Sequence, residues 1–231
     1  MATRTTTATT NTTTTERLLR ISRGIVFLVP GIFLGILGFV HFKDGLAVDS
    51  AVPVPVYMVA QIPIPKAAYV EAAKALSKAS PRNGEAVLSE AEARIHAGEP
   101  ASVVLPLLRN GLSHEPASAR AWTLLAETLR SKQPAWAAQA LTQAFLLSPR
   151  DTWIAGLRAQ DAALLWPYLD DDTRGMAIEQ TRRIWQEPFL RPQILAVVDT
   201  PQGAAMVTRS FGQDDIRAIN RWLRMQQRRA Q

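Results

Sequence analysis

Histidines and a run of aspartates are the residues of this sequence best suited to metal binding or acid–base chemistry. The three histidines are His41, His96 and His114, and no two of them have the spacing of metal ligands. Residues 170–172 are all aspartate, but the run lacks the alternating ligands and the glycine of a calcium loop. It directly precedes a helix that we expect to start at Thr173. We interpret it as negative charge at the positive end of that helix.

The rest of the sequence offers no recognisable set of catalytic residues. Cysteine is absent, which excludes a thiolate nucleophile, a disulfide framework and a cysteine-based zinc site. A phosphate-binding glycine loop and the motif of a nucleophile elbow are also absent. We therefore predict no catalytic, cofactor-binding or metal-binding residues, and a protein that is not an enzyme.

The size and charge of the chain limit what it can be. Its 231 residues, 47% of them apolar, suffice for one membrane segment and one or two small helical domains. The net charge of +6 would suit a nucleic-acid partner. However, residues 43–172 hold 12 basic and 14 acidic side chains, while residues 173–231 hold 10 basic and 5 acidic ones. The middle of the chain is not a basic surface, so we predict no nucleic-acid partner.

Residues 24–42 form an apolar stretch without any Asp, Glu, Lys or Arg. As a helix this stretch would extend roughly 28 Å, enough to cross the hydrocarbon core of a bilayer. We predict a transmembrane helix over residues 23–42, preceded by a disordered, threonine-rich cytoplasmic tail over residues 1–22. A buried helix of a soluble domain is the alternative, but such helices rarely lack a polar stripe over about five turns.

Charges on either side of this stretch predict its orientation. Lys43 alone follows it closely, beside Asp44 and Asp49. Four arginines precede it: Arg4, Arg17, Arg20 and Arg23. Because positive flanks stay in the cytoplasm, we predict a single-pass protein of the bacterial inner membrane, with a cytoplasmic N-terminus and a periplasmic C-terminal domain. A signal peptide cleaved near residues 45–47 is the alternative, although the stretch exceeds the roughly 7–15 apolar residues of such signals.

Glycines within the stretch suggest a contact between membrane helices. Gly31 and Gly35 form a G-x-x-x-G pair, and Gly38 follows one turn later. Small residues at this spacing let a second helix approach closely in the bilayer. We therefore expect the stretch to contact a second copy of the chain, forming a homodimer, or a larger membrane protein.

After the membrane segment the sequence changes from extended to helical patterning. Several prolines interrupt residues 43–65, which we interpret as an extended spacer. From Lys66 onward, alanine and leucine recur in helical segments of about 12–16 residues, with prolines expected at or near the helix starts. The predicted fold is all-α, with a helical domain over residues 66–172 and a C-terminal helical module over residues 173–231.

Three of these prolines recur at a repeat interval. Pro81 and Pro116 are 35 residues apart, and Pro116 and Pro149 are 33 residues apart. The alanines that stand ten residues after each proline are Ala91, Ala126 and Ala159. A first helix needs a small side chain where its partner helix approaches, so the spacing indicates repeated helix pairs.

Residues 116–149 carry this pattern most fully. Between the two prolines, the positions that match a helix-pair repeat are Trp122, Leu125, Ala126, Ala137, Leu141 and Ala144. The segment resembles a tetratricopeptide repeat, although the family usually has glycine at the position of Ala126 and an aromatic residue at that of Leu129. The resemblance implies a solenoid of antiparallel helix pairs that binds other proteins, with further units near residues 81–115 and 150–183. A helical bundle without repeats is the alternative.

The C-terminal module is expected to cap the array. We predict a helix through Ile184, a connector over residues 200–203 and a last helix near residues 214–229. The expected buried face of the last helix consists of Ile216, Ile219, Trp222 and Leu223. A basic stripe on another face consists of Arg217, Arg221, Arg224 and Arg228. We interpret this stripe as solvated surface, with an acidic partner or anionic lipid headgroups as the alternative.

These features together predict a membrane-anchored scaffold that binds membrane or periplasmic proteins. The order of tail, span and external repeat domain, with the ending over residues 217–223, also resembles bacterial accessory proteins of exopolysaccharide biosynthesis and export. Two alternatives share the layout: a chaperone-like factor beside the secretion channel, and an accessory subunit of a respiratory or photosynthetic membrane complex.

Overall fold

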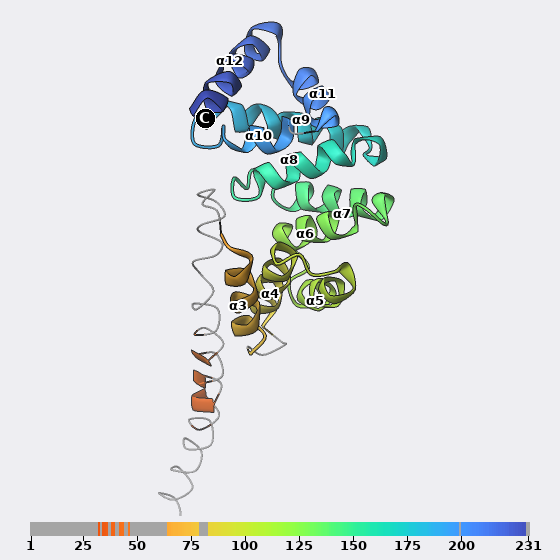
Figure 1. The fold of residues 1–231 in the computed structure, drawn as a ribbon. Coiled ribbons are helices and arrows are strands. Elements are labelled where there is room, and N and C mark those ends of the chain that lie inside the picture. The colour runs from red at the N-terminus through yellow and green to blue at the C-terminus, as the bar shows by residue number, and fades with distance from the viewer. Residues whose placement is uncertain are drawn as a thin grey trace, which may run out of the picture. The chain divides into compact units, whose positions relative to one another are not determined.

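The described part of the chain is entirely helical. The computed structural model describes residues 64–78, 83–198 and 200–229, together with residues 32, 34–36, 38–39, 42–43 and 46. None of these residues lies in a β-strand, which confirms the predicted all-α class for them. The chain divides into two compact units, Met1–Leu46 and Ala47–Gln231. The larger unit holds all of the labelled helices (Figure 1).

The smaller unit contains most of the predicted membrane segment. Its described residues are helical and exposed, and no neighbouring group lies within 4 Å of a Cβ atom placed on Gly35 or Gly38. Gly31, the tail over residues 1–22 and nearly all of the spacer lie outside the described residues. Among the residues that the structure describes, no helix is both long and apolar enough to cross a membrane. The span over residues 23–42 stays a prediction.

Five helices form the first part of the larger unit, and each packs on the next along the chain (Figure 1). They are α3 (Lys66–Leu76), α4 (Gly84–His96), α5 (Ala101–His114), α6 (Ala119–Leu129) and α7 (Pro134–Leu147). The contacts are most extensive between α4 and α5 and between α6 and α7. These are two of the three helix pairs that the proline spacing predicts.

The second part of the larger unit is arranged around a central helix. Its elements are α8 (Ala155–Leu164), a 3-10 turn η1 (Trp166–Tyr168), α9 (Asp171–Gln186), α10 (Gln193–Val198), α11 (Pro201–Ser210) and α12 (Gln213–Arg229). Helices α9, α10 and α11 all pack against α8. Small residues dominate α8, and they allow this close approach from several sides.

Polar side chains determine where several of these helices begin. Asp170 accepts a hydrogen bond from the backbone N–H of Thr173 at 2.7 Å, which confirms that the aspartate run marks a helix start. Thr200 accepts in the same way from the N–H of Gly203. The predicted connector over residues 200–203 is therefore wrong, because these residues are the N-cap and first turn of α11. Pro201 occupies the first helical position, where its missing N–H has no cost.

Several described prolines lie near helix starts, whereas Pro149 does not and Pro106 lies inside α5. Pro100 is the N-cap of α5, Pro134 is the first residue of α7, and Pro116 lies in the turn before α6. Pro149, in contrast, follows the end of α7, and the chain continues as a loop until α8 begins at residue 155. Pro81 lies outside the described residues.

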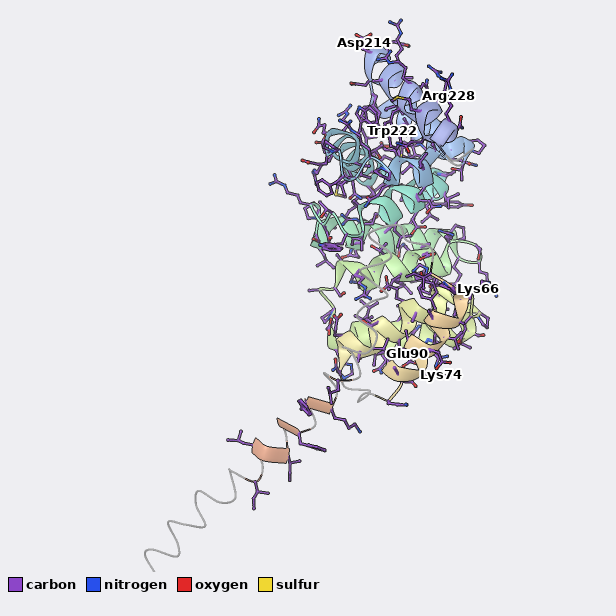
Figure 2. The ribbon with its side chains drawn as sticks, turned by 60° about the vertical axis from the view of Figure 1, so that its left-hand side comes forward. Lys66, Lys74, Glu90, Asp214, Trp222 and Arg228 are labelled. Carbon is purple, nitrogen blue, oxygen red and sulfur yellow. The ribbon has the colours of Figure 1, made fainter. Side chains whose placement is uncertain are left out.

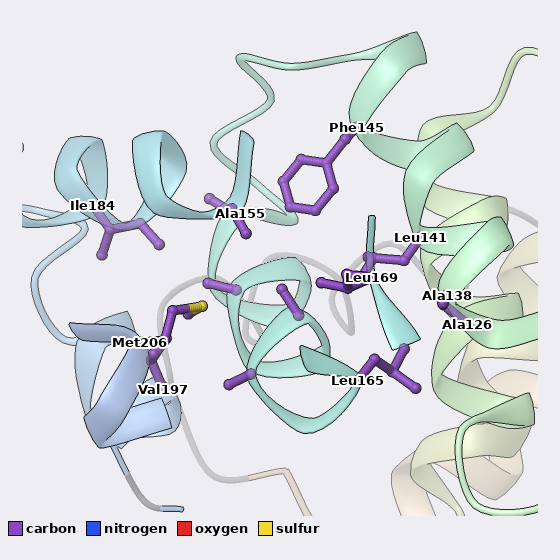
Figure 3. Packing of buried hydrophobic residues seen from close by; sticks show 14 of the residues in the cluster. Ala126, Ala138, Leu141, Phe145, Ala155, Leu165, Leu169, Ile184, Val197 and Met206 are labelled. Atoms are coloured by element: carbon purple, nitrogen blue, oxygen red, sulfur yellow. The ribbon is translucent and has the colours of Figure 1, made fainter. Parts of the chain in front are cut away.

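One hydrophobic core extends through most of the larger unit. It runs from Ala126 on α6 to Ile219 on α12. Figure 3 shows Leu141 approaching α8 from one side, with Val197 and Met206 on the other. The core continues across residue 172, where we expected the boundary between the repeat domain and the C-terminal module.

The last helix is attached by few side chains. Only Ile219 is buried on α12, while Ile216, Trp222 and Leu223 are half-buried. The Trp222 ring meets the Trp185 ring edge-on, with centroids 6.0 Å apart, and it faces the neighbouring helices (Figure 2). The face that carries the basic stripe is exposed.

Candidate protein-binding face on the first helices

The three alanines of the repeat interval occupy equivalent sites. Ala91 lies on α4, Ala126 on α6 and Ala159 on α8, and each is 0% exposed. We call α4, α6 and α8 the first helices, and α5, α7 and α9 the second helices. A larger side chain at any of these alanines would separate packed helices, which is the constraint that the spacing predicts.

The other repeat positions of residues 116–149 differ in how deeply they are buried between helices. Ala137, Leu141 and Ala144 on α7 are fully buried. Trp122 is only half-buried, and its indole N–H donates to the carbonyl of Pro116 at 2.8 Å. The residue that packs against both major core clusters is Leu125, which is half-buried. Trp122 therefore holds the turn before α6 to the helix as well as filling space beside it.

Side chains also connect successive pairs in register. On the second helices, the hydroxyl groups of Thr142 on α7 and Thr173 on α9 lie 2.9 Å apart. Within the first pair, Gly111 of α5 contacts Leu88 of α4 so closely that a Cβ atom would lie within 3.0 Å of it. Contacts of α4 with α6, of α6 with α8 and of α7 with α9 place these helices side by side across successive pairs.

A ladder of charged side chains crosses the first helices, and we call it the first-helix ladder. Its members are Glu85 and Glu92 on α4, Arg120, Glu127 and Arg130 on α6, and Asp161 on α8. Arg120 donates to Glu85 Oε1 from Nη1 at 3.2 Å and to Glu92 Oε2 from Nη2. Arg130 donates from Nη1 to Asp161 Oδ1 at 2.5 Å. The ladder therefore joins all three first helices.

The inner end of the ladder is strongly desolvated. Burial, with a smaller contribution from the nearby Glu127 carboxylate, raises the pKa of Asp161 to about 7, against the lowering effect of Arg130. Burial also raises the pKa of Glu127. One oxygen of each carboxyl group, Oδ2 of Asp161 and Oε2 of Glu127, is buried without a hydrogen-bond partner. Two carboxyl groups thus share one guanidinium group.

The ladder carries an excess of acidic groups. Four of its six members are carboxylic acids and two are arginines. Glu85, at the outer end, is the most accessible of the paired members, with 56% of its side chain exposed. The Glu85 carboxylate at this end can attract lysine and arginine side chains.

The histidines do not join the ladder as a metal site. His96 stacks on the ring of Tyr69 with centroids 5.2 Å apart, and its Nε2 is buried without a partner. His114 is exposed, with Nδ1 2.9 Å from the carbonyl oxygen of Asn110. His41 lies outside the described residues. Within the described ranges, no three histidine or carboxylate side chains are placed to hold a metal ion.

The arginine stripe of α12 is separate from the ladder. Arg217, Arg221, Arg224 and Arg228 are all exposed, and Arg217 Nη1 lies 3.5 Å from Asp214 Oδ1. Exposed pairs of this kind contribute little to folding. The structure thus gives the stripe a solvent-facing position and does not bring it into contact with the ladder's residues.

Sequence reasoning missed the buried charges of α8, above all Arg158. This side chain is fully buried and donates to the carbonyls of Ala144 at 3.0 Å, Ser148 at 2.6 Å and Asp151 at 3.2 Å. Its guanidinium also lies over the Phe145 ring, 5.0 Å from the centroid. Burial lowers its pKa to about 10. The signal available in the sequence was the position of Arg158 next to Ala159, inside the packed part of a first helix.

The described residues form an all-helical protein in which neighbouring helices pack on one another and charged side chains bridge α4, α6 and α8. Comparisons of the chain with protein family models, with curated proteins and with solved structures give no match.

Proposed function

We propose that this chain is a membrane-anchored, non-enzymatic scaffold whose tetratricopeptide-like domain binds other proteins outside the cytoplasm. The main observation behind the proposal is that the first helices share equivalent buried positions and are bridged by charged side chains. Buried alanines recur on α4, α6 and α8 at the repeat interval, and charged side chains bridge these same helices. Stacked helix pairs of this kind present an extended surface, which is the form that protein-binding solenoids use.

The partner that this face favours is a basic segment of another protein. Glu85, at the open end of the first-helix ladder, has 56% of its side chain exposed, whereas Asp161 at the inner end is fully buried. Long-range attraction between such a face and lysine or arginine residues speeds encounter and selects orientation. In this proposal the anchor over residues 23–42 fixes the scaffold at the membrane.

The proposed topology can be tested with reporter fusions. We expect a reporter that is active only in the periplasm to be active when it is fused after Gln231, because arginines dominate the N-terminal flank of the apolar stretch. The same reporter fused after residue 22 should be inactive and serves as the control. Activity confined to a cytoplasmic reporter at Gln231 would contradict the proposed location.

Partner binding can be tested by charge reversal at the open end of the ladder. Glu85→Lys should lower recovery of co-purifying proteins about tenfold, because it replaces an attractive charge with a repulsive one on the binding face. The fold should persist, since the Glu85–Arg120 pair is partly exposed. The measurement is affinity purification of the full chain in mild detergent, followed by quantitative mass spectrometry.

Glu71→Lys is the matched control for this variant. Glu71 is also an exposed glutamate in a surface ion pair, 2.8 Å from Lys74 on α3, but it does not belong to the ladder. We expect it to recover the same proteins as the wild type. Equal recovery by Glu85→Lys would remove the ladder from the binding site, and no specific partner for the wild type would argue against a scaffold.

A further inference from the structure

We propose that the groove between α7 and α9 is a second docking site, which takes a cationic, amphipathic helix of a partner protein. This groove lies on the second helices, whereas the first-helix ladder lies on the first helices, so the inference does not depend on the ladder. Its volume is about 470 Å³. The hydroxyl contact between Thr142 and Thr173 ties its two walls together, so the groove is preformed.

The α7 wall of the groove is apolar and uncharged. Helix α7 contains no charged residue along its whole length. Leu146 lines the groove with 59% of its surface exposed, and Trp136 and Leu147 are also exposed on this helix. Exposed apolar side chains that gather beside a groove mark interaction sites more often than scattered ones do. This wall therefore suits the apolar face of a partner.

The α9 wall contains a glycine that nothing within the described structure explains. Gly175 lies inside α9, where glycine costs roughly 0.5–1 kcal/mol relative to alanine. Four other helical glycines of this unit have a packing reason, since a Cβ atom at Gly84, Gly111, Gly156 or Gly203 would come within 3.0 Å of a neighbour. A Cβ atom at Gly175 would meet nothing within 4 Å. Close approach by a molecule outside the chain accounts for it.

Acidic residues on both sides of this glycine specify the charge of the occupant. Asp172, Gly175, Met176 and Glu179 stand at positions i, i+3, i+4 and i+7 of one helix face, and all four line the groove. Asp172 forms no ion pair with any described residue, and Glu179 has only a 3.6 Å contact with exposed Arg182. Arg183 also lines the groove, but its Nη1 donates to the Pro149 carbonyl at 2.9 Å. Lysine or arginine on the partner would complement the two carboxylates.

The occupant that fits these features is a helix. Two neighbouring helices leave a long groove between them, and a third helix seats its ridge of side chains there at an interaxial distance of about 8–10 Å. Glycine in one wall allows such a close approach, Leu146 and Met176 contact the apolar ridge, and Asp172 and Glu179 pair with flanking cations. An acidic partner would be repelled by Asp172 and Glu179.

The test uses a synthetic helical peptide of leucine, alanine and lysine with one apolar face, labelled with a fluorophore. Binding to the full chain in an uncharged detergent is followed by fluorescence anisotropy, with detergent alone as the blank. We expect saturable binding that weakens as salt rises. Gly175→Leu should weaken it at least tenfold, because the side chain fills the groove, while it leaves the melting temperature unchanged or higher. Leu146→Ser should weaken binding without loss of fold.

Two matched controls make the result decisive. Gln139→Leu adds an exposed leucine to α7 outside the groove lining, and Met225→Ser removes an exposed apolar side chain from α12. Both should bind the peptide as the wild type does. No saturable binding, equal binding by Gly175→Leu, or equal binding of a peptide with glutamate in place of lysine would each overturn the inference. The Glu85→Lys variant should bind this peptide normally, which separates the groove from the ladder.

Discussion

Arg158→Met should lower the free energy of unfolding by about 3–5 kcal/mol. The guanidinium of Arg158 is the donor for three backbone carbonyls at the end of α7 and in the loop that follows it. A methionine fills a similar space but leaves these carbonyls without that donor, and each unsatisfied buried group costs about 1–3 kcal/mol. Removal of a desolvated charge offsets part of this loss. Chemical denaturation followed by circular dichroism measures the change.

Arg183→Met is the matched control, because Arg183 serves the same loop from a half-buried position. Its Nη1 donates one hydrogen bond, to the carbonyl of Pro149. Water can replace that donor, so we expect a loss of about 1 kcal/mol or less. Arg158→Lys should recover only part of the stability, since one ammonium group cannot reproduce the planar fork that reaches three carbonyls. Similar losses for Arg158→Met and Arg183→Met would contradict the proposed role of Arg158.

The repeat interval predicted the helix packing because the constraint behind it is local. A small residue is needed wherever two helices cross closely, and Ala91, Ala126 and Ala159 meet that need within their own helix pairs. The all-α class follows from apolar residues at helical spacing, which are mainly alanine and leucine from residue 66 to about residue 165. These features could be predicted because they depend on neighbours close in the chain.

Features that depend on distant neighbours could not be predicted in this way. Residues 200–203 have the composition of a connector, but tertiary packing keeps them helical, and Gly203 lies against the carbonyl of Val197 too closely for any side chain. Pro149 resembles a helix start, yet the carbonyls beside it turn to Arg158 instead. Arg158 and Asp161 are charged residues, a type that usually lies at the surface. Three later helices, α9, α10 and α11, pack against α8 and bury these two side chains. The sequence around α8 does not indicate this packing.

The partial burial of Trp122 has a similar cause. The repeat resemblance placed this ring between paired helices, but the ring instead extends to the turn before α6, where its N–H reaches the Pro116 carbonyl. The ring packs against the edge of the core, and its hydrogen bond depends on the geometry of a turn that sequence spacing does not specify.

Asp161→Asn should raise the free energy of unfolding at pH 8 by about 2–4 kcal/mol. Burial raises the pKa of Asp161 from 3.8 to about 7, so the folded state binds this proton more tightly than the unfolded state. A raised carboxyl pKa makes stability fall as the pH rises from about 4 to about 7, because the unfolded state loses the proton first. Each pKa unit corresponds to 1.36 kcal/mol. Asparagine stays neutral and removes this loss.

The comparison of wild type and variant across pH isolates this effect. At pH 4 the Asp161 carboxyl group of the wild type is protonated, so the two proteins should have similar free energies of unfolding. As the pH rises to 7, the free energy of unfolding should fall for the wild type relative to the variant. Above pH 7 the difference should stay constant. Glu127 titrates in the same cluster, and its pKa is also raised by burial. Asp170→Ala is a control that should change the free energy of unfolding in the opposite direction. It removes a helix cap whose carboxylate has a lowered pKa, and it should lower the free energy of unfolding by about 0.5–2 kcal/mol at neutral pH. If Asp161→Asn destabilises the protein at pH 8, the Arg130 ion pair outweighs desolvation, and the inner end of the ladder is a net stabilising contact between α6 and α8.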